Sequence, residues 1–124
     1  MSELAANIVV IARLLLGGTF VIFAIRNFGN VERLSGILKD QSIPLARPVV
    51  IVGVGLQLAG GLLSAIGPWA VVGSVLMIVF LVLATTLFHP MWKYSGADRY
   101  PHTTATLLNS ALIGGFLLLI ALSL

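Results

Sequence analysis

Residues 8–25 read IVVIARLLLGGTFVIFAI, an apolar run that contains a single charged side chain, Arg13. A helix of about 20 apolar residues crosses the hydrocarbon core of a bilayer, so this run is long enough to span a membrane. Three further stretches, 48–66, 69–88 and 107–124, have the same length and character. None of the four has the polar face that a helix of a soluble bundle needs. The sequence therefore predicts an all-α protein, a bundle of four transmembrane helices.

The overall composition agrees with this interpretation. Of the 124 residues, 59% are hydrophobic and 9% are charged, against about half and about a quarter in soluble domains. The length fits a single membrane domain over 1–124. The net charge of +3 indicates no nucleic-acid partner, because no basic stripe alternates with aromatic residues. The absence of cysteine excludes disulfide exchange, thiolate zinc sites and iron–sulfur ligation by this chain. The first span is expected to be retained, because MSELAAN before it resembles no signal-peptide start.

The connections between the spans differ in length. Gly67-Pro68 alone joins the second and third spans, which predicts a tight antiparallel hairpin. The first loop, 29–47, has apolar residues at helical spacing among charged ones, which predicts a short helix lying in the membrane interface. An ordinary amphipathic turn without a lipid role is the alternative. The last loop, 89–105, carries Trp92, Tyr94 and Tyr100, the residue types of an interfacial aromatic belt.

The charges predict an orientation. Apart from Arg13, every Lys and Arg lies on one side of the predicted bundle: Arg26, Arg33, Lys39, Arg47, Lys93 and Arg99. Positively charged loops tend to remain in the cytoplasm. We therefore expect a multi-pass protein of the inner (plasma) membrane, with loops 29–47 and 89–105 cytoplasmic and both termini outside.

Small residues recur within the spans at the spacing that lets membrane helices approach closely. Examples are the pairs Gly55/Ala59, Gly60/Ser64 and Ala111/Gly115. The same pattern is compatible with a homo-oligomer, but we favour packing within one bundle.

Two polar groups are predicted inside the spans. Arg13 and Gln57 each fall about 13–15 Å from the outer edge, counting 1.5 Å per residue from Leu4 and from the hairpin turn. The guanidinium donates and the amide carbonyl accepts, so we predict that they pair. Alternatively, Arg13 extends outward along the helix. A second polar group lies near the inner edge and comprises Thr85, Thr86, His89 and Asn109.

Each group has a structural and a functional interpretation. Arg13 and Gln57 either lock two helices together or bind a ligand, and His89 either ends the third span or binds one. Haem is not expected, because His89 and His102 lie at opposite ends of one loop. A metal site of His89, Asp98 and His102 is not expected either, because spacing alone in a loop is weak support.

The chain resembles the DoxX-like family of small four-helix membrane proteins. The resemblance runs through ARLLLGGTFVIFAI, IPLARPVVIVGVGLQLAGGLL, FHPMW and LLNSALIGGFLLL, in this order. The family's arginine of the first helix falls on Arg13, its histidine on His89 and its asparagine before Gly-Gly on Asn109. Two positions depart from the family. Gln57 stands where many members have a carboxylate, and residues 24–27 replace the Gly-x-x-Lys that often ends the first helix.

The resemblance implies two functions. The first is a membrane subunit or anchor of a redox complex, linked to quinone and without catalytic activity of its own. Under this hypothesis, His89 and Asn109 hydrogen-bond the carbonyl groups of a quinone, and aromatic residues such as Trp92 stack on the quinone ring. The partners are then peripheral oxidoreductase subunits. The alternative is a component of a small-solute or proton-linked transporter, in which Arg13 attracts an anionic substrate. The sequence contains no nucleophile–base pair and no phosphate-binding loop, so it does not predict an enzyme.

Overall fold

The computed structural model describes residues 1–124 and contains five α-helices joined by short turns. The helices are α1 (Glu3–Phe28), α2 (Val31–Asp40), α3 (Ala46–Ala65), α4 (Ala70–Phe88) and α5 (Arg99–Ser123). Three 3₁₀ turns, Gly67–Trp69, Met91–Lys93 and Gly96–Asp98, lie between the last three helices. Four helices, α1, α3, α4 and α5, are long and apolar enough to cross a membrane. The predicted all-α fold, with four candidate spans and a short helix between the first two, is confirmed.

Two helices extend beyond their predicted bounds. α1 begins at Glu3, where the Ser2 hydroxyl accepts a hydrogen bond from the Ala5 N–H at 3.1 Å. Its 26 residues make it about 39 Å long, whereas the 20 residues of α3 make about 30 Å. α5 begins at Arg99, eight residues before the predicted start at 107. Pro101 does not prevent this, because the first turn of a helix needs no N–H from it.

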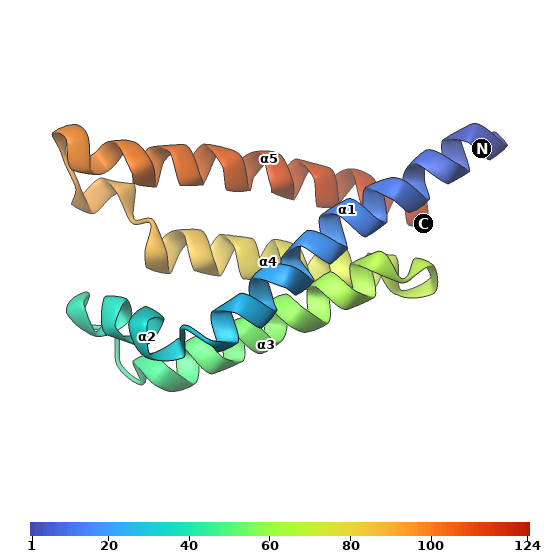
Figure 1. The fold of residues 1–124 in the computed structure, drawn as a ribbon. Coiled ribbons are helices and arrows are strands. Elements are labelled where there is room, and N and C mark those ends of the chain that lie inside the picture. The colour runs from blue at the N-terminus through green and yellow to red at the C-terminus, as the bar shows by residue number, and fades with distance from the viewer.

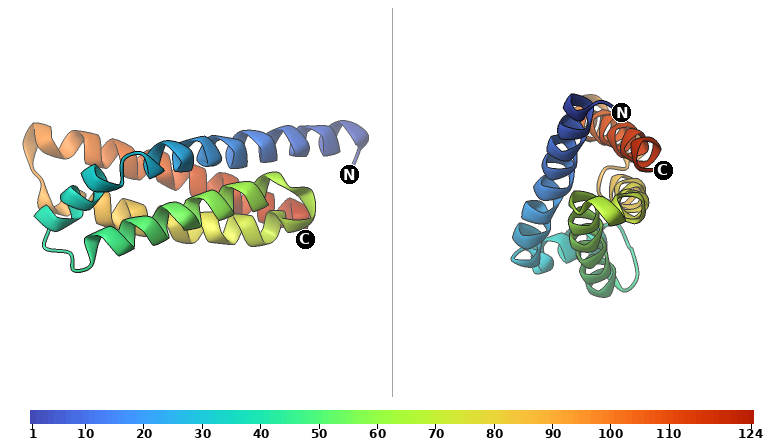
Figure 2. Two further views of the ribbon diagram at one scale, coloured as in Figure 1. Left: turned by 60° about the horizontal axis from the view of Figure 1, so that its bottom comes forward. Right: turned by 90° about the vertical axis from the view of Figure 1, so that its right-hand side faces the viewer.

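The helices form a bundle with two different ends. α3 and α4 lie side by side and antiparallel, α1 crosses α3, and α5 runs along α4 (Figure 1). The turn at Gly67–Trp69 and both termini lie at one end, which we call the hairpin end. α2 and residues 89–98 lie at the other end, which we call the loop end. In Figure 2, α1 projects past the turn between α3 and α4.

Glycine residues bring the helices into contact in the half of the bundle near the hairpin end. A Cβ atom added at Gly17 would clash with the Gly61 carbonyl oxygen and lie 2.7 Å from the Ala65 nitrogen. A Cβ at Gly73 would lie 2.8 Å from the Ser64 Cα. Because these neighbours are backbone atoms, only glycine fits. The backbones of α1, α3 and α4 therefore touch directly, as small residues allow in membrane proteins.

α2 packs on the bundle through its apolar face. Leu38 is fully buried in a cluster with Ala46, Val50 and Val54 of α3. The Gln41 side-chain amide that follows α2 donates to the Leu87 carbonyl of α4 at 3.0 Å. The apolar spacing that predicted this helix therefore serves its contact with α3 and α4.

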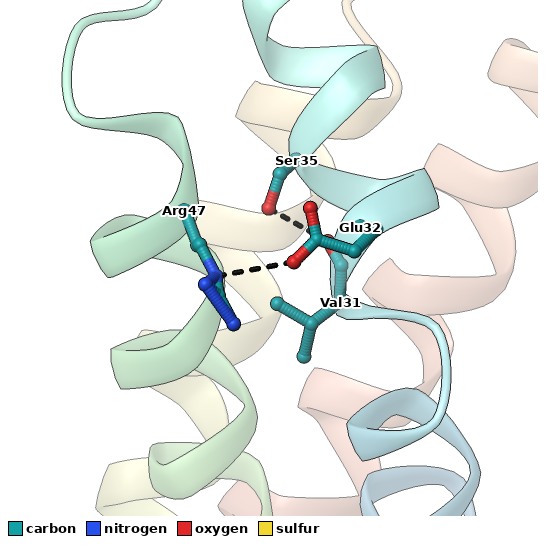
Figure 3. A network of polar contacts seen from close by, with 4 residues as sticks. All are labelled: Val31, Glu32, Ser35 and Arg47. Carbon is teal, nitrogen blue, oxygen red and sulfur yellow. Dashed lines mark hydrogen bonds and ion pairs between the residues drawn. The ribbon is translucent and has the colours of Figure 1, made fainter.

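An exposed ion pair also connects α2 to the start of α3. Arg47 Nε lies 3.2 Å from Glu32 Oε1 (Figure 3). On the same helix, the Ser35 hydroxyl donates to the Val31 carbonyl at 2.6 Å. Ser35 is buried, so this bond inside α2 satisfies a hydroxyl that water cannot reach.

Candidate functional site

The predicted pair of Arg13 and Gln57 is wrong. The Arg13 guanidinium lies beside the hairpin turn, where a Cβ at Gly67 would be 3.0 Å from its Nη1 atom. Gln57 lies ten residues earlier on α3, about 15 Å along the helix. The outward extension of Arg13 is thus the arrangement found.

The predicted pair required an offset between α1 and α3 along the bundle axis that the structure does not have. The prediction placed the start of α1 and the hairpin turn at the same height. In the structure α1 is six residues longer than α3, and the contact of Gly17 with Gly61 and Ala65 sets their offset. This contact puts Arg13 level with the turn, and the residues before it project beyond.

Gln57 has a different partner, Asn27. The Asn27 Nδ2 atom donates to the Gln57 Oε1 atom at 3.0 Å. Gln57 is only 3% exposed, so this bond joins α1 to α3 inside the bundle. Asn27 was not predicted, because it lies beyond the predicted end of the first span at residue 25.

His89 and Asn109 come together at the loop end, as the sequence indicated. His89 is the residue that follows α4, and its Nδ1 atom lies 3.1 Å from the Nδ1 atom of His102 on α5. Asn109, also on α5, donates to the Thr85 hydroxyl of α4 at 2.8 Å. These contacts hold α4 and α5 together where the turns between them are irregular.

His102 adds a feature that was not predicted. Its ring stacks on Tyr94, with centroids 4.1 Å apart and planes 13° apart. In the contact with His89, an N–H of one imidazole donates to the unprotonated nitrogen of the other. Asp98 does not join the two histidines in a group that could hold a metal ion. The spacing of thirteen residues between the histidines gave no signal, because the conformation of the connecting turns determines whether they meet.

A cavity of about 700 Å³ lies near the loop end and is lined mainly by α3 and α4, with residues of α2 and α5 completing its wall. Its wall is mostly apolar, and its polar lining residues are Asn27, Arg33, His89, Tyr94, His102 and Asn109. Gly53 contributes to the space, because no atom lies within 4 Å of the position a Cβ would take. Leu56 of α3 and Phe80, Leu83 and Leu87 of α4 form part of the apolar wall.

The other predicted ligand-binding residues lie outside this cavity. Trp92 is 63% exposed and does not line it. Gln57 does not line the cavity and contacts it only through its hydrogen-bond partner Asn27. Arg13 lies at the opposite end of the bundle. Of the five predicted residues, the structure brings together His89 and Asn109.

The lining suits an amphipathic, membrane-soluble molecule. Binding sites for small molecules typically have volumes of about 300–1,000 Å³, apolar walls and a few convergent polar groups. Each amide of Asn27 and Asn109 has hydrogen-bonding capacity beyond its one partner. The ring of His89 likewise has a second nitrogen available.

Comparison with known proteins identifies the family. The DoxX family model matches residues 8–90, which are 83 of the 124 residues. The chain therefore belongs to the DoxX family. The match covers α1 to α4 and ends before α5, so it does not include Asn109 or His102. No curated protein and no solved structure matches the chain.

Proposed function

We propose that this integral membrane protein of the DoxX family binds a quinone in the cavity lined mainly by α3 and α4. In this proposal the chain is a membrane subunit or anchor of a redox complex. It has no catalytic activity of its own, and a partner oxidoreductase subunit supplies the electrons. The observation that carries the proposal is a largely apolar cavity that His89 lines from the end of α4 and Asn109 lines from α5.

The chemistry of a quinone fits both parts of the cavity. Its ring and isoprenoid tail are apolar and suit the wall formed by Leu56, Phe80 and Leu83. Its two carbonyl oxygens accept hydrogen bonds, which an amide N–H of Asn109 and a ring N–H of His89 can donate. Tyr94, instead of the predicted Trp92, provides an aromatic face in the lining.

Binding of a short-chain quinone to the purified protein tests the proposal. The probe is decylubiquinone, titrated in detergent into the wild type, His89→Leu and Asn109→Leu. Loss of one hydrogen bond between neutral groups costs about 1 kcal/mol, so each variant should bind about fivefold more weakly. Trp92→Leu is the matched control outside the cavity and should bind like the wild type. Equal affinity in all four proteins would refute the assignment of this cavity.

We also propose that the protein lies in the plasma membrane with the loop end in the cytoplasm. Six Lys and Arg residues at the loop end, and only Arg13 near the hairpin end, support this orientation. The cysteine-free chain allows a direct test with Ser2→Cys and Ser95→Cys, since both serines are exposed. A membrane-impermeant thiol reagent should label Ser2→Cys in intact cells and Ser95→Cys only after lysis. The reverse pattern would invert the orientation.

A further inference from the structure

Arg13 is the only lysine or arginine near the hairpin end. The other six lie in or beside the connections at the loop end. The guanidinium of an arginine stays protonated in proteins, so it keeps its positive charge. Arg13 therefore brings a permanent positive charge to an otherwise apolar part of the bundle.

No group in the chain neutralises this charge. Arg13 forms no salt bridge, since the one ion pair of the protein joins Arg47 to Glu32. Its Nε atom is buried and has no hydrogen-bond partner. The end of α3 at Ala65 has the partial negative charge of a helix C-terminus, but none of its carbonyls accepts a hydrogen bond from Arg13. Arg13 is half-buried, and a partly buried cation without an acceptor is unfavourable, particularly within a membrane.

The position of the guanidinium indicates which acceptor would reach it. It lies against Gly67 in the turn that ends α3 and begins α4, where the chain reverses direction. Such a turn marks one surface of the membrane, and half-exposed Trp69 in the same turn is a residue type typical of the headgroup layer. Phosphate groups of lipids lie in this layer, and the planar fork of a guanidinium binds phosphate oxygens in pairs.

We infer that Arg13 and the hairpin turn form a binding site for a phosphate group. The phosphate belongs either to a lipid headgroup or to a free anion, and both offer the same oxygen acceptors to the guanidinium. This site lies at the opposite end of the bundle from the cavity and does not depend on the quinone proposal. Its ligand would complete the hydrogen bonds of a side chain that no residue of the protein satisfies.

The test uses the full chain in a maltoside detergent, which contains no phosphate. Three probes are added separately: phosphatidylglycerol, phosphatidylcholine and inorganic phosphate. Thermal unfolding measures stabilisation, and native mass spectrometry measures how many lipids remain bound. Arg13→Gln removes the charge, Arg13→Lys keeps the charge without the fork, and Arg26→Gln is the matched control, because Arg26 is an exposed arginine at the other end of α1.

A phosphate probe should stabilise the wild type and Arg26→Gln. Its affinity for Arg13→Gln should be at least about tenfold lower than for the wild type, as expected for a lost charge-assisted hydrogen bond. Arg13→Lys should bind with intermediate affinity, because an ammonium binds phosphate as a point charge. Stabilisation by the lipids alone would identify a headgroup site. Stabilisation by inorganic phosphate as well would identify a general anion site. An equal response of Arg13→Gln and the wild type, or no response of either, would overturn the inference.

Discussion

Glycines have opposite roles at the helix contacts near the hairpin end and at the cavity near the loop end. Near the hairpin end, Gly17, Gly61 and Gly73 lie in backbone-to-backbone contact, where any side chain would clash. Nearer the loop end, Gly53 lines the cavity and has no atom within 4 Å of the position a Cβ would take, and Gly55, outside the cavity, has none either. The same residue type thus brings helices together in one half and leaves space between them in the other. A glycine pattern alone therefore does not distinguish close packing from a cavity.

Polar groups divide between the halves in the same manner. In the hairpin half, the buried polar atoms Arg13 Nε, Ser64 Oγ and Ser74 Oγ have no partner. In the loop half, side chains bond between helices, as in Asn27 with Gln57, Asn109 with Thr85 and His89 with His102. Close backbone contact holds the first half together. The second half contains the cavity, and hydrogen bonds between side chains connect its helices.

The largest expected effect comes from adding a methyl group where the helices touch. Gly17→Ala and Gly73→Ala should each lower the free energy of unfolding by about 3 kcal/mol. This is the upper end of the usual cost of overpacking, because the added methyl group clashes with backbone atoms. Thermal or chemical unfolding in detergent measures the change. Gly55→Ala is the control and should be neutral or stabilising by up to about 1 kcal/mol. Equal losses at Gly17 and Gly55 would remove the distinction between the halves.

A large side chain at Gly53 tests the open half. Gly53→Leu should fill part of the cavity and weaken decylubiquinone binding about tenfold or more, equivalent to about 1.4 kcal/mol. Because nothing lies close to Gly53, thermal stability should hardly change. Titration and thermal unfolding of the same preparation separate these two effects. Unchanged affinity would mean that quinone, if bound, occupies another place.

The hydrogen bond between Asn27 and Gln57 should give a measurable coupling. A double-mutant cycle with Asn27→Leu and Gln57→Leu is expected to show about 0.6 kcal/mol, and at most about 1.7, as for polar pairs between membrane helices. The corresponding cycle of Arg13→Leu with Gln57→Leu should be additive, because the two side chains do not meet. Coupling in the second cycle but not in the first would contradict the offset between α1 and α3.

The smallest effect is expected for the ion pair between α2 and α3. The side chains of Arg47 and Glu32 are 57% and 77% exposed, so solvent screens their attraction. Glu32→Gln and Arg47→Gln should each change the free energy of unfolding by less than about 0.5 kcal/mol. A loss above 1 kcal/mol in either variant would show that this pair, and not the burial of Leu38, holds α2 on the bundle.

The number and type of the helices could be predicted because they depend on local properties. Hydropathy identified the four candidate spans, and the spacing around Leu34 and Leu38 identified α2. The depth of Arg13 could not be predicted, because it depends on which glycines of α1 and α3 meet. A sequence shows that Gly17 and Gly61 are small but not that they are in contact. A helix of 26 residues beside one of 20 can take several offsets.

The candidate site was predictable in part for a related reason. His89 follows the predicted span 69–88 and Asn109 lies near the start of the predicted span 107–124, so simple topology places them close together. The contact of His102 with Tyr94 and His89 depends on two 3₁₀ turns between α4 and α5, whose conformation has no clear sequence signal. The outward direction of Trp92 depends on the same turns.

The three-residue turn at Gly67–Trp69 also has a consequence for how the chain assembles. With Ile66, four residues join Ala65 to Ala70, and this connection spans about 18 Å at most. The joined ends of α3 and α4 therefore stay close to each other once both helices have entered the bilayer. Contacts between segments near each other in the sequence form before distant ones, so we expect this hairpin to form first and α1 and α5 to join it later. Doubling the length of the turn would cost only about 0.6 kcal/mol of stability, so its shortness matters more for the order of folding than for the final stability.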